Sequence, residues 1–264
     1  GVHKLTSNFL RSLGVNTATI NPKNIKIYGH GGKSLPLLNS DTQSYDMIEN
    51  TIQVIGEDDF TFNDDDYILM YAIGPKKYNS DNNSHINPYS DDAFYYLNIS
   101  SGNGSRMNLA TEPNTAANVT FETFHDYKFV ESDEYNIAKL GRRWFGHRFY
   151  VENTREFNFD FPNIITSSPI NLKVYVAATS ESNTSMSLKL NGSEVNNFSF
   201  SSIDSQLLAS EDSFNELLNI SSSTVSVELN YNNNGNPSAS AYLDYISIEA
   251  ERSLISLGTQ FEFK

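Results

Sequence analysis

The chain has 264 residues and a formal net charge of −14, with 32 acidic against 18 basic residues. A surface of this sign repels phosphate backbones, so nucleic-acid binding is not expected. The chain contains no cysteine, which excludes a cysteine nucleophile, disulfide bonds and a zinc–thiolate site, and favours an exported protein. No apolar run approaches the roughly 18 residues of a membrane-spanning helix, so no membrane span is expected.

The first half of the chain predicts one helix and several short strands. Thr6 and Ser7 are residues that cap a helix, Leu10 lies on its apolar face, and Gly14 is expected to end it. Alternating or continuous apolar residues predict four strands, of which the third is apolar enough to be a central strand. These strands cover residues 24–28, 51–55, 67–72 and 94–99.

The second half predicts a more uniform set of strands. Apolar and polar residues alternate over residues 157–161, 171–176, 185–190, 195–200, 224–231 and 242–249. Asn191-Gly192 is the signal of a type I′ hairpin between two of them. Residues 214–218 are interpreted as a short helix or a further strand. The segment 121–146 is interpreted as the joint between the halves, with a helical stretch near residues 134–140.

These elements predict a mainly β protein with two domains. Residues 1–125 are expected to form a small α+β domain with a mixed sheet. Residues 126–264 are expected to form an antiparallel β-sandwich of the jelly-roll type. The chain carries no signal peptide and opens at once on ordered-looking sequence. It is therefore expected to be a fragment of a longer protein.

An acidic loop is the candidate metal site. Clustered carboxylates and an asparagine are ligands that calcium prefers, although the spacing does not match the twelve-residue helix-loop-helix pattern. Calcium binding and a solvated acidic turn both remain open, and no other cofactor is predicted. The candidate ligands are Asp58, Asp59, Asn63, Asp64 and Asp66.

Catalytic motifs are weak in this chain. Gly31-Gly32-Lys33-Ser34 looks like the end of a phosphate-binding loop, but Ile27 stands where that loop needs a glycine. His125 and Asp126 are adjacent ionisable residues without a nucleophile motif beside them. A hydrolase that uses them, or the acidic loop, would need a pocket in which such groups converge.

A segment rich in arginine and aromatic residues is the candidate interaction patch. Three interpretations remain open for it: a docking surface for a protein partner, a contact with sugar or lipopolysaccharide, and an interface within the chain. The last would bury the tryptophan and pair the arginines with nearby acids. The candidate residues are Arg142, Arg143, Trp144 and Arg148.

Several runs, in order along almost the whole chain, resemble the region that precedes the peptidase domain in the gingipain-like cysteine-peptidase sortases of type IX secretion in Bacteroidetes. The individual motifs are short, and their joint occurrence carries the resemblance. The runs are Lys4-Leu5-Thr6, Phe9-Leu10, Leu13-Gly14, Pro22, Asn24-Ile25, residues 28–32, Leu35-Pro36, residues 56–69, 87–90, 141–146, 234–237 and 242–246.

The resemblance implies an exported, surface-exposed protein associated with the outer membrane. Such a sortase removes a C-terminal sorting domain from secreted cargo and joins the cargo to a lipopolysaccharide anchor. Its His–Cys dyad would lie in a peptidase domain that follows this chain, and no catalytic position of the family matches a residue here. The chain is then a non-catalytic accessory region whose partners are its own peptidase domain, other outer-membrane secretion components or cargo.

The alternative function is a carbohydrate-binding jelly-roll module of a cell-surface glycan-utilisation protein. Trp144 and the many tyrosines would supply an exposed aromatic platform for such a module. A buried Trp144 would count against it.

Overall fold

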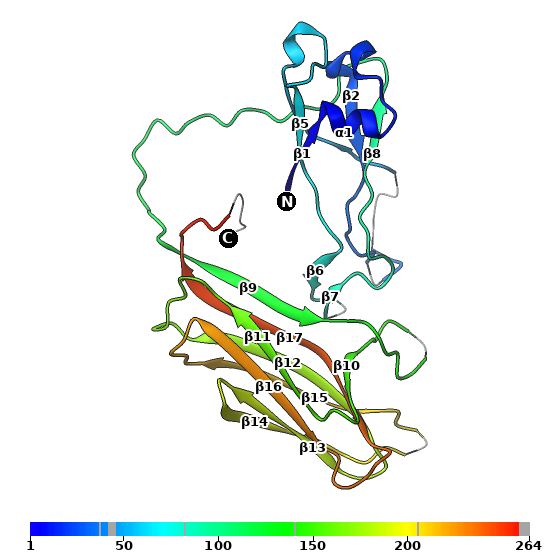
Figure 1. Cartoon of the computed structure of the whole chain (residues 1–264), viewed down its shortest axis with the longest axis vertical. Helices are drawn as coiled ribbons and strands as arrows, with labels where there is room; N and C mark the ends of the chain where they lie inside the picture. Colours follow the sequence, from blue (N-terminus) through cyan, green and yellow to red (C-terminus); the bar gives the residue numbers. More distant parts are fainter. Residues whose placement is uncertain (37, 42–45, 82, 140, 205, 259–264) are drawn as a thin grey trace. The chain divides into compact units, whose positions relative to one another are not determined.

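The computed structural model describes residues 1–36, 38–41, 46–81, 83–139, 141–204 and 206–258. The chain divides into two compact units, Gly1–Ala116 and Ala117–Lys264 (Figure 1). The protein is mainly β, as predicted, and the described residues contain one α-helix. The predicted domain boundary at residue 125 falls inside strand β9 (Thr123–Glu131), which belongs to the second unit. No helix in the described part of the chain is long and apolar enough to cross a membrane.

The first unit contains the helix and two small antiparallel sheets. One sheet has the strand order β1-β5-β4 and the other has β3-β2-β8, while β6 and β7 form a separate hairpin. Strand β5 is central in its sheet, as its apolar run predicts. The elements are β1 Val2–Thr6, α1 Ser7–Ser12, β2 Ile25–Tyr28, β3 Glu49–Asn50, β4 Gln53–Ile55, β5 Tyr67–Tyr71, β6 Lys76–Asn79, β7 Ser84–Ile86 and β8 Tyr96–Ile99, with 3-10 turns at Thr17–Thr19, Pro22–Asn24 and Glu57–Asp59.

Helix α1 begins where its capping residues predict. The Thr6 hydroxyl oxygen accepts a hydrogen bond from the Phe9 backbone N–H at 3.3 Å, which satisfies one of the free donors of the first turn. Leu10 is fully buried, whereas Phe9 remains partly exposed. Gly14 follows with a φ of 87°, a left-handed conformation that ends helices. The helix therefore contributes one apolar residue, Leu10, to the core and also buries Ser7.

The core of the first unit is small and comes from every part of it. The helix gives one residue, the strands give most of the others, and loops complete the cluster. A unit of this size buries a modest share of its surface, so polar contacts between its segments matter more than in a large domain. The buried residues are Leu10, Ile25, Ile27, Ile52, Val54, Phe62, Ile68 and Met70.

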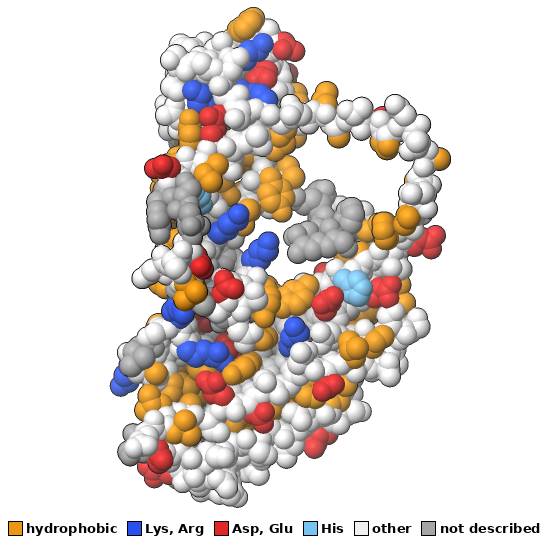
Figure 2. Space-filling model, turned by 180° about the vertical axis from the view of Figure 1, so that it is seen from behind, with side chains coloured by type: hydrophobic (Ala, Val, Ile, Leu, Met, Phe, Trp, Pro, Cys, Tyr) orange, Lys and Arg blue, Asp and Glu red, His pale blue; other side chains and the backbone are white. Residues whose placement is uncertain are grey.

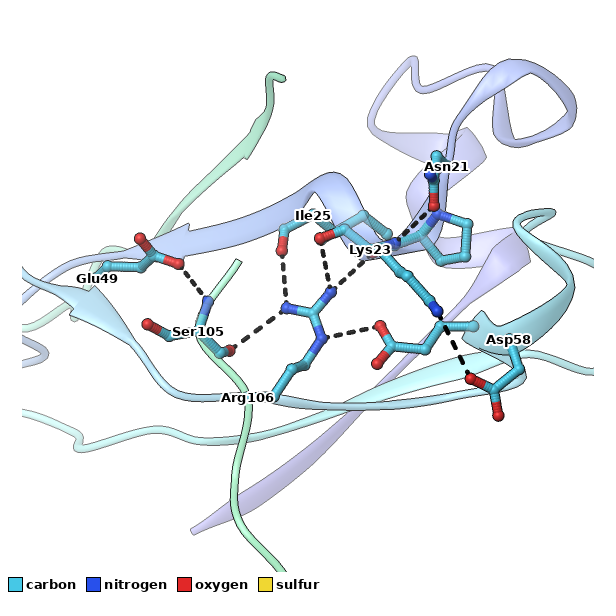
Figure 3. A network of polar contacts seen from close by, with 9 residues as sticks. Asn21, Lys23, Ile25, Glu49, Asp58, Ser105 and Arg106 are labelled. Atoms are coloured by element: carbon cyan, nitrogen blue, oxygen red, sulfur yellow. Dashed lines mark hydrogen bonds and ion pairs between the residues drawn. The ribbon is translucent and has the colours of Figure 1, made fainter. Parts of the chain in front are cut away.

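Arg106 joins three segments of the first unit (Figure 3). Its Nε donates to Glu57 Oε2 at 2.8 Å, and its Nη2 donates to the Pro22 carbonyl at 2.9 Å and to the Lys23 carbonyl at 3.1 Å. Its Nη1 donates to the Ile25 carbonyl at 3.2 Å. The planar guanidinium fork can reach these acceptors together, which a lysine cannot do. Arg106 thereby holds its own segment against the start of β2.

Replacing Arg106 by alanine is expected to destabilise the first unit by about 2–3 kcal/mol, because a carboxylate and several carbonyls lose their donor in a half-buried site. Hydrogen exchange of peptides that cover β2 and β8 should become faster in R106A. The exposed Lys77→Ala serves as a control and should leave the exchange unchanged. Equal protection in R106A and the parent chain would show that the network does not hold the unit together.

The second unit is a jelly roll. Strands β10 to β17 form two antiparallel sheets with the orders β10-β17-β12-β15 and β11-β16-β13-β14, the arrangement of a jelly roll made of two Greek keys. Strand β9 extends the first sheet by pairing with β17 beside β10. The predicted sandwich is confirmed. The elements are β9 Thr123–Glu131, β10 Gly146–Phe149, β11 Thr154–Asp160, β12 Ile170–Thr179, β13 Thr184–Leu190, β14 Ser193–Phe200, β15 Ser210–Leu218, β16 Thr224–Asn232 and β17 Ser240–Ser253.

The sandwich core forms between the inner faces of the two sheets. Along β13 every second residue is buried and the residues between are half-buried, as a strand with one solvent face requires. Asn191 and Gly192 have φ values of 48° and 80°, which confirms the predicted turn between β13 and β14. Strand β17 carries buried residues on both faces over much of its length, so it is the most deeply enclosed strand.

Two expectations about the joint are corrected by the structure. The predicted helix near residues 134–140 is wrong: Tyr135 instead pairs with Phe145 through two backbone hydrogen bonds of 2.7 and 2.9 Å. Lys139 and Gly141 have positive φ values, which a helix does not allow. The segment 121–146 also contains β9, so it is part of the sandwich. Residues 214–218 lie in β15, which decides between helix and strand there.

Candidate functional site

The arginine-aromatic segment runs into β10 and bends there. Phe145 and Phe149 are buried, with exposed fractions of 2% and 0%. Between Gly146 and Arg148 the pairing with β17 shifts by a bulge, and His147 has a φ of 39°. A Cβ at Gly146 would lie 2.5 Å from the Ser132 carbonyl oxygen. The bulge therefore depends on glycine at this position.

Two of the predicted patch residues, Trp144 and Arg148, pack against other parts of the same chain. Arg148 Nη2 donates to Ser240 Oγ at 2.8 Å, and its guanidinium lies 4.5 Å from the centre of the Tyr150 ring. Trp144 is half-buried and Arg142 is exposed. Within the described residues, Arg142 makes no hydrogen bond or ion pair. The predicted interface within the chain is thus observed for Arg148. A contact of Arg142 with a protein partner or a sugar stays a prediction.

Arg143 and Asp244 form the centre of the site. Arg143 Nη2 lies 3.0 Å from Asp244 Oδ2 and 4.0 Å from Glu211 Oε2. Its guanidinium also lies 4.2 Å from the centre of the Tyr175 ring, and Tyr175 Oη donates to Glu211 at 2.8 Å. One arginine from the loop before β10 thereby links residues of β12, β15 and β17 on one sheet face.

Asp244 is a carboxyl group in an unfavourable place for charge. Its exposed fraction is 3%, and burial raises its pKa to about 8 because the charged form loses water. Arg143 opposes this rise, while Glu131 and Asp133 add to it. The sequence reading missed Asp244 as a site residue. The available signal was an aspartate inside the apolar strand 242–246, where buried charges are rare.

The raised pKa of Asp244 makes the stability of the second unit depend on pH. The folded state holds the proton more tightly than the unfolded chain, whose ordinary pKa is 3.8. The stabilising contribution is complete below that value and is lost as pH rises through about 8. Stability should therefore fall with pH by up to about 1.4 kcal/mol per unit in this window.

Asp244→Asn is expected to remove this dependence, because the amide cannot ionise. The free energy of unfolding of D244N minus that of the parent should increase from about pH 5 to about pH 8. Urea unfolding followed by the fluorescence of Trp144, the one tryptophan of the chain, measures it. Asp160→Asn, at an exposed carboxyl in β11, is the matched control. Parallel pH profiles of D244N and the parent chain would contradict the assignment.

The acidic side chains of the candidate calcium loop make hydrogen bonds and ion pairs within the first unit. Asp59 accepts from Asn63 Nδ2 at 3.0 Å, and Asp66 accepts from the Asn63 backbone N–H at 2.6 Å. Asp64 pairs with Arg11, and Asp58 lies 3.7 Å from Lys23 Nζ. Among the described residues, no three His, Asp or Glu side chains lie close enough to hold a metal ion. Calcium binding stays a prediction, which titration with calcium followed by melting temperature can decide.

The candidate hydrolase residues do not converge. His125 Nδ1 lies 3.2 Å from Glu249 Oε1, whereas Asp126 pairs with Arg252 at 2.6 Å. The two are consecutive in β9, so their side chains point to opposite faces of the sheet. A cavity of about 320 Å³ in the first unit is lined by His30 and Lys33 with mainly apolar and tyrosine neighbours, and none of its described lining residues carries a carboxylate.

Charge is not gathered in one place on the face of the protein seen in Figure 2. Acidic, basic and hydrophobic side chains of the described residues are interspersed there, and no large area of a single charge is visible. The net charge of −14 is therefore spread over this face rather than concentrated in a patch.

The fold defines a class of protein region: a small α+β unit followed by a jelly-roll sandwich with one additional edge strand. This whole arrangement matches the crystal structure of dimeric latent PorU from Porphyromonas gingivalis, with a TM-score of 0.74 and 22% identity. The match covers 100% of this chain and 24% of PorU, so the chain spans about a quarter of that protein. The predicted resemblance is confirmed at the level of fold.

Other comparisons give little. The sequence matches no protein-family model and no curated protein. A family 36 carbohydrate-binding module in complex with calcium and xylotriose is 17% identical with a TM-score of 0.29, and covers 38% of this chain and 77% of its own. A family 35 module from Clostridium thermocellum is 12% identical with a TM-score of 0.28, and covers 50% and 98%. Neither likeness is close enough to support a function.

Proposed function

We propose that this chain is a non-catalytic accessory region of a type IX secretion sortase, exported to the cell surface and associated with the outer membrane. The observation that carries the proposal is the match of the complete chain to one quarter of PorU. The order of the short sequence runs supports it, because they lie along nearly the whole chain rather than in one motif.

The catalytic part of the proposed sortase would lie elsewhere in the polypeptide. A cysteine peptidase needs a thiolate nucleophile, and this chain has no cysteine. The role proposed for the chain is to contact its own peptidase domain, other outer-membrane secretion components or cargo. In this proposal the complete protein removes C-terminal sorting signals and attaches cargo to a lipopolysaccharide anchor.

Arg142 is the patch residue best placed for such a contact. Its neighbours Arg143 and Arg148 are held by Asp244 and Ser240, whereas Arg142 is exposed and has no partner among the described residues. Exposed arginines beside a partly buried tryptophan are typical of binding hot spots. The half-buried state of Trp144 gives less support to the alternative of a sugar module built on that ring.

The proposal predicts that the isolated chain does not cleave peptides carrying a C-terminal sorting signal. In cells, a full-length sortase carrying Arg142→Glu should process cargo more slowly, because charge reversal disrupts docking without disturbing the core. Accumulation of cargo with an uncleaved sorting signal, seen on immunoblots, measures this effect.

Two controls make the experiment decisive. Lys77→Glu reverses an exposed charge in the first unit and should leave cargo processing unchanged. The melting temperature of R142E should equal that of the parent chain. Peptide cleavage by the isolated chain would contradict the non-catalytic role. Normal processing by R142E, together with normal processing after deletion of both units, would contradict the accessory role.

A further inference from the structure

The outer face of the second sandwich sheet carries a groove with an unusual lining. The groove has a volume of about 250 Å³ and lies across β13, β14 and β16. Its lining consists of amides and hydroxyls with one carboxylate and no apolar or aromatic side chain among the described residues. The lining residues are Ser185, Ser187, Glu194, Asn197, Asn230 and Asn232.

The strand register places these side chains in two cross-strand rows. Ser187 lies opposite Asn197 on one side and Asn230 on the other. Ser185 lies opposite Asn232 in the next row. Neighbouring strands are roughly 4.7–4.9 Å apart, so each row offers hydrogen-bonding groups at this spacing. Because the residues stand on paired strands, the spacing of their backbones is set by the sheet.

A bulge shapes one side of the groove. The pairing of β13 with β14 shifts between Leu188 and Lys189, which leaves Val195 as an additional residue on β14. A bulge of this kind bends its strand and increases the local twist. Strand β14, at the edge of the sheet next to β13, therefore bends beside the two polar rows.

The polar groups of the groove are free to bind a ligand. Within the described residues, the side chains of Ser185, Ser187, Asn197 and Asn230 make no hydrogen bond. Asn232 uses its Oδ1 to accept from the Asn234 backbone N–H at 2.9 Å, which leaves its amide donors unused. Asparagine is also depleted in strands. Its placement within β14 and β16 goes against local preference, which is expected where a position serves binding.

Charge narrows the class of ligand. Glu194 is the one acidic side chain among the described lining residues, and the chain as a whole has a net charge of −14. The adjacent Lys189 is neutralised by Glu228 at 2.8 Å. An anionic ligand would be repelled by the Glu194 side chain, with no unpaired cation among the described residues beside it to compensate. An apolar ligand would cover the asparagine amides and leave them without hydrogen-bond partners. A neutral chain rich in hydroxyls satisfies both requirements.

We propose that this groove binds a neutral oligosaccharide, whose hydroxyls both donate to and accept from the Asn and Ser side chains. The inference is independent of the proposed sortase role and does not involve Trp144. Without ring stacking the contact consists of a few solvent-exposed hydrogen bonds, so the expected dissociation constant is roughly millimolar.

The test uses the whole chain labelled with nitrogen-15 and a panel of neutral hexasaccharides: cellohexaose, maltohexaose, mannohexaose and N-acetylchitohexaose. At least one of them should shift the side-chain amide resonances of Asn197, Asn230 and Asn232 along a saturable curve. The double variant Asn197→Ala/Asn230→Ala should weaken that binding by about tenfold or more.

Asn158→Ala is the matched control, because Asn158 is an exposed strand asparagine on the neighbouring β11, opposite Ser226 and outside the groove. It should leave the affinity unchanged. The proposal is overturned if none of the four sugars shifts the groove amides, or if binding survives in a folded double variant. A negative result here leaves the cargo-processing experiment with R142E unaffected, so the two proposals can fail separately.

Discussion

The second unit depends on the enclosure of strand β17. This strand pairs with β12 along one side and with β9 and β10 along the other over most of its length, so most of its backbone groups are satisfied within the sheet. Its inner residues fill the sandwich core, and the loop before β10 covers part of its outer face. Asp244 is a buried carboxyl on this strand, and Arg143 Nη2 lies 3.0 Å from its Oδ2 without the geometry of a hydrogen bond. The charge of Arg143 is therefore the main compensation for burying this group.

The same constraint explains the geometry of the arginine-aromatic segment. To cover β17, the chain turns back through the Tyr135–Phe145 pair and enters β10 through the bulge at Gly146. Phe145 and Phe149 anchor the segment in the interior. Arg143 is then directed at Asp244, while Arg142 remains in solvent. One short segment thus combines residues that stabilise the sandwich with one residue available to a partner.

Much of the sandwich could be predicted from sequence because its strands alternate cleanly. Strands β13, β16 and β17 and the Asn191-Gly192 turn all follow from local pattern. Strand β9 could not be predicted in this way, since its pairing with β17 is a contact between distant parts of the chain and its residues are mixed in polarity. The Arg143–Asp244 pair was hidden for the same reason. Arg143 lies in the predicted patch and Asp244 in a predicted strand, but only the fold brings them together.

The polar groove illustrates a second limit of sequence reading. Ser185, Ser187, Asn197 and Asn230 lie on solvent-facing positions, where alternation predicts polar residues but does not distinguish a wetted surface from a binding surface. Their alignment in rows is a property of register, which is decided between strands rather than within them. The predicted patch at Arg142 and the groove lie on the same sandwich, yet only the first has a recognisable sequence signal.

The pairing of β9 with the end of β17 also has a mechanical consequence. Thr123, where β9 begins, lies opposite Ser253, where β17 ends. A pulling force applied between these two residues would act on the hydrogen bonds between β9 and β17 one after another, starting at this end. It would not shear all of these bonds at the same time. The edge strand β9 would therefore separate from β17 at a smaller force than a shearing geometry would require, while the eight strands of the jelly roll keep their own pairing.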